Sequence, residues 1–113
     1  MTPDEFRALA FSQPEAVESG HMGKADFRVR KKIFATLDAD GEMATLKLDP
    51  DLQEAMRAQL GDPVFPANGS WGRKGWTRLT LSPLAETDVA SWMREAWFLT
   101  APVTLRRQHE ERS

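Results

Sequence analysis

Apolar and polar residues alternate in short stretches between residues 26 and 48, and this pattern constrains the fold more than any other feature. Residues 26–30 and 44–48 alternate strictly, and residues 33–37 form a run rich in β-forming types. The sequence Asp-Ala-Asp-Gly at residues 38–41 is typical of a turn. The pattern predicts three antiparallel strands, with Lys31 and Lys32 near the first tight turn and Gly41 in the second. It also allows a short strand at residues 17–21.

Helix signals precede and follow these strands. Thr2, Pro3 and Glu5 form a capping box with proline at the first helical position. Asp49 followed by Pro50 predicts a second helix. Its apolar side, which we expect to face the core, contains Leu52, Ala55, Met56 and Leu60. A late strand is expected at residues 76–81 and a last helix at about 86–100.

The predicted order is therefore α-β-β-β-α-β-α. Hairpin-linked strands with helices at intervals indicate an α+β fold, in which an antiparallel sheet is flanked by helices. We expect one domain over residues 1–104, since no repeat, linker or second core is evident. Residues 106–113 contain no apolar side chain, so residues 105–113 are expected to form a polar, mobile tail.

The composition removes several classes of chemistry. The 113-residue chain has no Cys, no Tyr and two His, so disulfides, thiolate metal sites and thiol or phenol catalysis are excluded. No phosphate-binding glycine motif or nucleophile elbow is present. We therefore predict a protein that is not an enzyme and needs no cofactor or metal. We expect it to be cytoplasmic, because no apolar run approaches the length of a membrane span. The sequence does not determine the oligomeric state, for which a monomer is favoured.

Charge is unevenly distributed along the chain. The formal net charge is -2, which argues against a globally basic nucleic-acid binder. Residues 24–32, however, contain five basic residues and one acidic residue, and residues 70–80 contain three basic residues and no acidic one. Residues 38–62 contain seven acidic residues and two basic ones. Two basic segments thus lie among acidic ones, and they form a positive patch only if the fold brings them together.

The second basic segment also carries aromatic residues. Trp71 and Trp76 flank Arg73 and Lys74, and indole rings stack on bases while basic side chains neutralise phosphates. The alternative is that one or both Trp side chains pack in the core and the charges are solvated. The candidate nucleic-acid-binding residues are Arg28, Arg30, Lys31, Lys32, Arg73, Lys74, Trp76 and Arg78. Neutralisation of about five phosphates would give a log–log salt slope near -4.5.

Three motifs together resemble the MmcQ/YjbR family over most of the chain. They are the stretch from His21 to Ala35, the Leu-Lys-Leu-Asp-Pro sequence at residues 46–50, and Gly75-Trp76 ahead of the late strand. The resemblance implies a compact α+β domain with a double-wing arrangement that has been likened to a DNA-binding motif. It supplies no catalytic residues. Many members have Gly-Gly in the first hairpin turn, where this chain has Arg30 and Lys31.

Three hypotheses about function follow. The first is a DNA-binding or other nucleic-acid-binding module that contacts phosphates through its basic hairpins. The second is a protein-interaction adaptor that uses the exposed face of the sheet. The third is a small-molecule binder, or an unrecognised enzyme, with a cleft near His21 and Trp76.

Overall fold

The computed structural model describes residues 1–21 and 23–110. Its strands are β1 (Val17–His21), β2 (Lys24–Val29), β3 (Lys32–Leu37), β4 (Met43–Lys47), β5 (Val64–Pro66) and β6 (Trp76–Thr80). Its helices are α1 (Pro3–Phe11), α2 (Pro50–Leu60), α3 (Ser70–Arg73), α4 (Glu86–Thr100) and α5 (Val103–Glu110). The α+β prediction is confirmed, and the structure adds β5, α3 and α5 to the predicted elements.

All six strands belong to one antiparallel sheet in the order β1-β2-β3-β4-β6-β5. The β2–β3 turn contains Arg30 and Lys31, whose φ values are 49° and 72°. Positive φ at both central residues is typical of a type I′ hairpin turn, which usually contains Asn or Gly there. The chain therefore keeps the turn that glycine would favour and places two cations in it.

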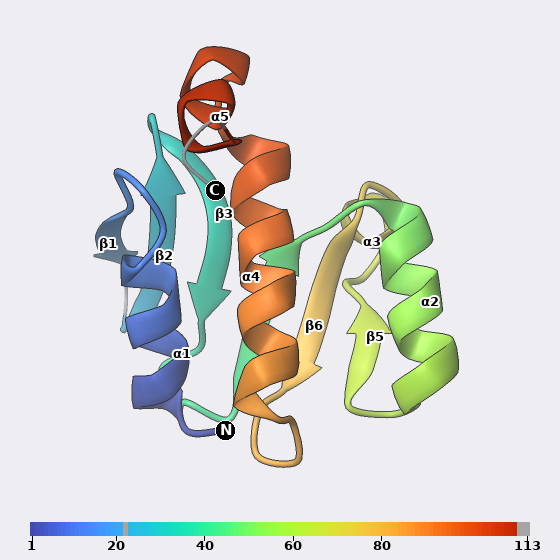
Figure 1. The fold of residues 1–113 in the computed structure, drawn as a ribbon. Helices are drawn as coiled ribbons and strands as arrows, with labels where there is room; N and C mark the ends of the chain where they lie inside the picture. Colours follow the sequence, from blue (N-terminus) through green and yellow to red (C-terminus); the bar gives the residue numbers. More distant parts are fainter. Residues whose placement is uncertain (22, 111–113) are drawn as a thin grey trace.

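Helices α1, α2 and α4 cover one face of the sheet (Figure 1). Alternate strand residues point into this layer, and the largest fully buried side chains include Phe6, Phe27, Phe34, Leu46, Leu79, Met93 and Trp97. The capping signals are confirmed, because the Thr2 side chain accepts from the Glu5 N–H and the Asp49 side chain accepts from the Asp51 N–H. No helix in the described ranges has the length and apolar character needed to cross a membrane.

The opposite side of the sheet, here called the open face, is lined by the other half of the strand residues. On β6, Leu79 is buried against the helices while Trp76 and Arg78 are only half-buried. This confirms the predicted alternation of residues 76–81. The short helix α3 follows β5 and lies near the start of β6, behind α2 in Figure 1.

Two local predictions are wrong. Residues 105–110 belong to α5 and do not form a polar tail, because Leu105 is buried and the His109 ring packs edge-on against Trp97. In α2 the predicted stripe is confirmed for Leu52, Met56 and Leu60, which pack in or against the core, but Ala55 is exposed and Gln53 is buried in addition. Residues 111–113 of the predicted tail lie outside the described residues.

Candidate nucleic-acid interface

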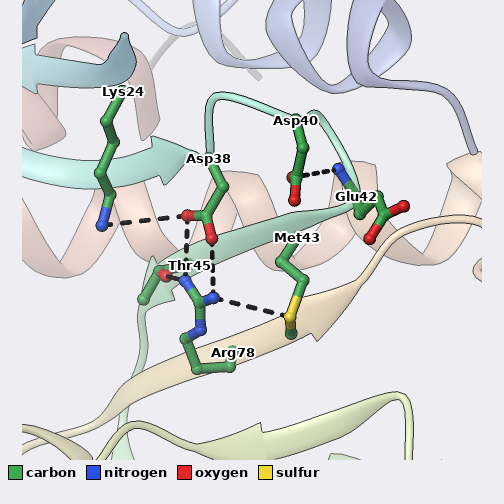
Figure 2. Close-up of polar contacts among 7 residues, drawn as sticks. All are labelled: Lys24, Asp38, Asp40, Glu42, Met43, Thr45 and Arg78. Atoms are coloured by element: carbon green, nitrogen blue, oxygen red, sulfur yellow. Dashed lines mark hydrogen bonds and ion pairs between the residues drawn. The ribbon is translucent and has the colours of Figure 1, made fainter. Parts of the chain in front are cut away.

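The Arg78 guanidinium and the Asp38 carboxylate form a bidentate ion pair, here called the fork, on the open face (Figure 2). Arg78 Nη1 donates to Asp38 Oδ1 at 3.1 Å, and Nη2 donates to Asp38 Oδ2 at 2.9 Å. Nη1 also donates to the Thr45 hydroxyl at 2.8 Å, and Lys24 Nζ lies 3.9 Å from Asp38 Oδ1. The Arg78 guanidinium lowers the pKa of Asp38, and the carboxylate in turn raises the pKa of Arg78. Arg78 is thus already neutralised by a carboxylate of the same chain.

Two further predicted contact residues are also paired. On β2, Arg28 Nε donates to Asp26 Oδ1 at 2.9 Å on the open face. In the first turn, Arg30 donates two hydrogen bonds to the Glu15 carboxylate, at 2.6 and 3.0 Å. Three of the four predicted arginines, Arg28, Arg30 and Arg78, are thus paired, which reduces the charge that they can offer to an external phosphate.

The remaining cations gather at one end of the sheet. Because β2 and β3, β3 and β4, and β4 and β6 are each antiparallel, the β2–β3 turn, the end of β4 and the start of β6 share this end. It is the upper end in Figure 1. We call it the basic end, and we define it by Lys31, Lys47, Arg73 and Lys74. The acidic β3–β4 turn, which contains Asp38, Asp40 and Glu42, lies at the other end.

A pair of indoles lies beside the basic end. The Trp71 and Trp76 rings meet edge to face, with centroids 6.1 Å apart. Lys47 Nζ lies 5.9 Å from the centroid of a Trp76 ring, and Lys74 Nζ lies 5.9 Å from the centroid of a Trp71 ring. Trp71 is 61% exposed and Trp76 is half-buried on the open face, so neither lies in the core. The alternative that the indoles are core residues is therefore wrong.

Lys47 was not among the predicted site residues. It is the cross-strand neighbour of Trp76, and its ammonium donates to the Lys74 carbonyl. Burial lowers the pKa of Lys47, and the nearby charge of Lys74 lowers it further, while Asp49 opposes both effects. An anion placed between Lys47 and Lys74 would relieve their repulsion.

Close backbone packing fixes the loop that carries Trp71. Gly75 has φ of 105°, and its carbonyl accepts from the Leu48 N–H at 2.9 Å. A Cβ at Gly75 would lie 1.7 Å from the Leu48 carbonyl oxygen, so only glycine fits there. From α2, the Gln53 amide nitrogen lies 3.2 Å from the Gly72 carbonyl oxygen and 2.9 Å from the Thr77 hydroxyl. The apolar periodicity of α2 gave no sign of this role.

A hollow of about 330 Å³ opens on this face. Its lining comes from four strands, from α3 and from the residue that follows β5. The residues are Lys24, Ile33, Thr36, Thr45, Ala67, Trp71, Trp76 and Arg78. Because β2 and the segment after β5 both border it, the open face is concave. The hollow joins the indole pair to the Asp38–Arg78 fork.

Lys32 does not lie on the open face. Across the two-residue β2–β3 turn Lys32 pairs directly with the buried Val29, so it lies on the helix-covered side. The imidazole of His21 lies outside the described part of the structure. No group of three or more His, Cys, Asp or Glu residues able to hold a metal occurs in the ranges that the structure describes.

The family is decided by a comparison with protein-family models, in which the YjbR model matches residues 11–99. The chain belongs to the YjbR family. This confirms the resemblance that the three motifs indicated. A search of the curated proteins finds no match.

Two solved structures have the same fold as this YjbR chain. One is the crystal structure of a Deinococcus radiodurans protein with a DUF419 domain, with a TM-score of 0.76 and 21% identity; the match covers 87% of this chain and 77% of that one. The other is a Pseudomonas syringae protein, with a TM-score of 0.69 and 19% identity; the match covers 88% of this chain and 99% of that one. At these identities the likeness concerns the fold alone.

Proposed function

We propose that this YjbR domain binds nucleic acid, whose phosphates lie along the basic end of the open face. The observation that carries the proposal is the indole pair with a lysine over each ring, at the same sheet end as the Lys31 turn. Basic side chains beside exposed aromatic rings are the usual means of binding single-stranded nucleic acid.

The contact set differs from the predicted one. Arg28, Arg30 and Arg78 are held by carboxylates of the chain, and Lys32 lies on the other side of the sheet. The proposal therefore assigns phosphate contacts to the four cations of the basic end. In the described part of the chain, the side chain of Lys47 donates to the Lys74 carbonyl, and the other three cationic groups make no hydrogen bond or ion pair. These cations extend over about three strand spacings, roughly 14 Å.

The lysine charges at the indole pair determine whether the site favours an anionic or a cationic ligand. A pair of indoles at an angle could enclose a quaternary ammonium group, as aromatic cages do. Here Lys47 and Lys74 already lie over the rings, so a cationic ligand would be repelled. A phosphate-bearing ligand is attracted by the same two charges. The domain acts in this proposal as a binding module with no catalytic step.

The test is the salt dependence of binding to a labelled single strand, measured by fluorescence anisotropy. With four phosphates neutralised, the log–log slope is expected near -2.8 for single strands and near -3.6 for a duplex. Lys74→Ala should make the slope shallower by about 0.7, because one phosphate contact is lost. Arg57→Ala, which removes an equal charge from exposed α2, is the control and should leave the slope unchanged. No binding at tens of micromolar protein in low salt would refute the proposal.

A second candidate function is binding of a protein strand. Within the described ranges, β1 pairs only with β2, so its outer edge is open, and Val17 on this strand is 61% exposed. Such an edge can accept an added strand from a partner. Capture of a partner that persists after nuclease treatment and is lost in Ser19→Pro would support this candidate, since proline blocks edge pairing.

A further inference from the structure

The hollow on the open face has the features of a site for one flat ring. Trp71 and Trp76 border it, and Thr36 and Thr45, which are directly paired across β3 and β4, also line it. Its volume of about 330 Å³ is at the lower end of the range for small-molecule sites. It is therefore large enough for a single ring system and too small for a base pair with its stacked neighbours.

We propose that this hollow receives one unpaired base of the bound nucleic acid, with Trp71 stacked on its face and Thr36 hydrogen-bonded to its edge. The inference rests on the proposed function and deepens it, because it names the form of nucleic acid that the site selects. Bases in a duplex are stacked on both faces and paired along their edges, so only an unpaired base can enter.

The position of the charges fits a nucleotide whose base enters the hollow and whose phosphate lies at the basic end. Lys47 and Lys74 lie beside the indoles at the basic end, where the phosphate of an inserted nucleotide would lie. At the other end of the hollow, Arg78 and Lys24 share the Asp38 carboxylate, so this end has less positive charge than the basic end. The phosphate is thus favoured at one end and the uncharged base at the other.

Thr36 provides a group that needs a partner. Its hydroxyl oxygen is buried and, in the part of the chain that the structure describes, has no hydrogen-bond partner. The neighbouring Thr45 hydroxyl accepts from Arg78, so its own proton remains available to donate. Because Thr36 lines the hollow, rotation about its Cα–Cβ bond to another staggered rotamer would turn the buried hydroxyl toward the hollow. A base edge would then satisfy it.

Competition binding with a labelled ten-nucleotide oligo-dT tests this assignment. An unlabelled single strand should displace the probe at a concentration at least about tenfold lower than a duplex of equal length. Trp71→Ala should weaken single-strand binding about tenfold and leave duplex binding unchanged, since stacking on one base contributes about 1–3 kcal/mol. Leu99→Ala, at an exposed apolar position of α4, is the matched control.

Thr36→Val keeps the shape of the side chain and removes the hydroxyl. It should change the relative affinities for oligo-dA, oligo-dC and oligo-dT two- to tenfold without lowering stability. Equal affinity for single strand and duplex, with Trp71→Ala and Thr36→Val both without effect, would overturn the base site and leave the proposed function intact.

Titration with deoxyadenosine monophosphate separates the two proposals in the opposite direction. Mononucleotide binding that Trp71→Ala abolishes, in a protein that binds no oligonucleotide, would refute the proposed function and show that the hollow accepts a free nucleotide instead of a base of a bound strand. Absence of binding to mononucleotide and oligonucleotide alike would overturn both.

Discussion

Removal of the Asp38 carboxylate tests how strongly the fork holds Arg78. The side chains of Arg78 and Asp38 are 22% and 28% exposed, so the pair lies between the surface and buried classes. Surface pairs contribute about 0–1 kcal/mol, and loss of one member of a buried pair costs about 3–5 kcal/mol. Asn retains one acceptor, so we expect Asp38→Asn to lower the free energy of unfolding by about 1.5–2 kcal/mol. At about 4 °C per kcal/mol, the Tm should fall by about 6–8 °C.

The matched control is Asp40→Asn in the same turn. It removes an equal charge but keeps the side-chain oxygen that accepts from the Glu42 N–H at 2.9 Å (Figure 2). The Asp40 charge acts on Arg78 more weakly than Asp38 does, without a hydrogen bond. Its effect should stay within about 0.5 kcal/mol. Guanidinium denaturation and thermal unfolding followed by circular dichroism measure both variants. Equal stability of the two variants would refute the role assigned to the fork.

The same pair predicts a dependence on pH. Arg78 lowers the pKa of Asp38 in the folded protein, so the stabilisation is fully present above the carboxyl pKa of the unfolded chain, about 3.9. It is lost as the pH falls through the lowered folded pKa. The stability difference between wild type and Asp38→Asn should therefore be constant near neutrality and shrink in acid. A difference that persists at pH 2 would contradict this assignment.

The remaining predictions concern the basic end and the loop beside it. Lys31→Gly should raise the free energy of unfolding by up to about 1 kcal/mol in urea denaturation, because Lys31 has a φ of 72°, which glycine adopts without strain. The same change should make the log–log salt slope of oligonucleotide binding shallower by about 0.7. Lower stability would show that the turn is not strained. Lys47→Met should leave the free energy of unfolding unchanged or raise it slightly, since burial disfavours the charged ammonium and already lowers the pKa of Lys47. It should weaken oligonucleotide binding at least threefold. A destabilised variant that binds normally would contradict the role assigned to Lys47. Gly75→Ala should lower the free energy of unfolding by about 3 kcal/mol or more, because the added Cβ would clash with the Leu48 carbonyl oxygen. Unchanged stability in denaturant would show that the loop packs differently.

Local sequence signals predicted most of the fold. The alternation of residues 26–30 and 76–81 depends only on neighbours along the chain, and the capping residues Thr2 and Asp49 act within one helical turn. The structure confirms these elements. The last helix, α5, gave no comparable signal, because Leu105 is the one residue that it buries and its other apolar residue, Val103, is exposed.

The candidate site was less predictable, because contacts between distant residues determine it. The sequence offered Arg78 as a free cation, but its partner Asp38 lies 40 residues away. The sequence also offered Lys32 as a contact residue, but its pairing with the buried Val29 places it on the helix-covered side; this pairing depends on the length of the turn. Trp71 was noted for its neighbours Arg73 and Lys74, but its contact with Trp76 depends on the packing of Gly75 against Leu48.

The most direct test of the nucleic-acid interface uses the four Trp residues of the chain as internal probes. The indole N–H resonances of ¹⁵N-labelled protein would be followed by NMR during titration with oligo-dT. Trp71 and Trp76 border the open face, whereas Trp92 and Trp97 are buried in the helix layer, with the Trp97 indole donating to the Pro14 carbonyl. Shifts of the Trp71 and Trp76 signals that saturate, with those of Trp92 and Trp97 unchanged, are the predicted result. Four unchanged signals, or shifts confined to Trp92 and Trp97, would contradict the account.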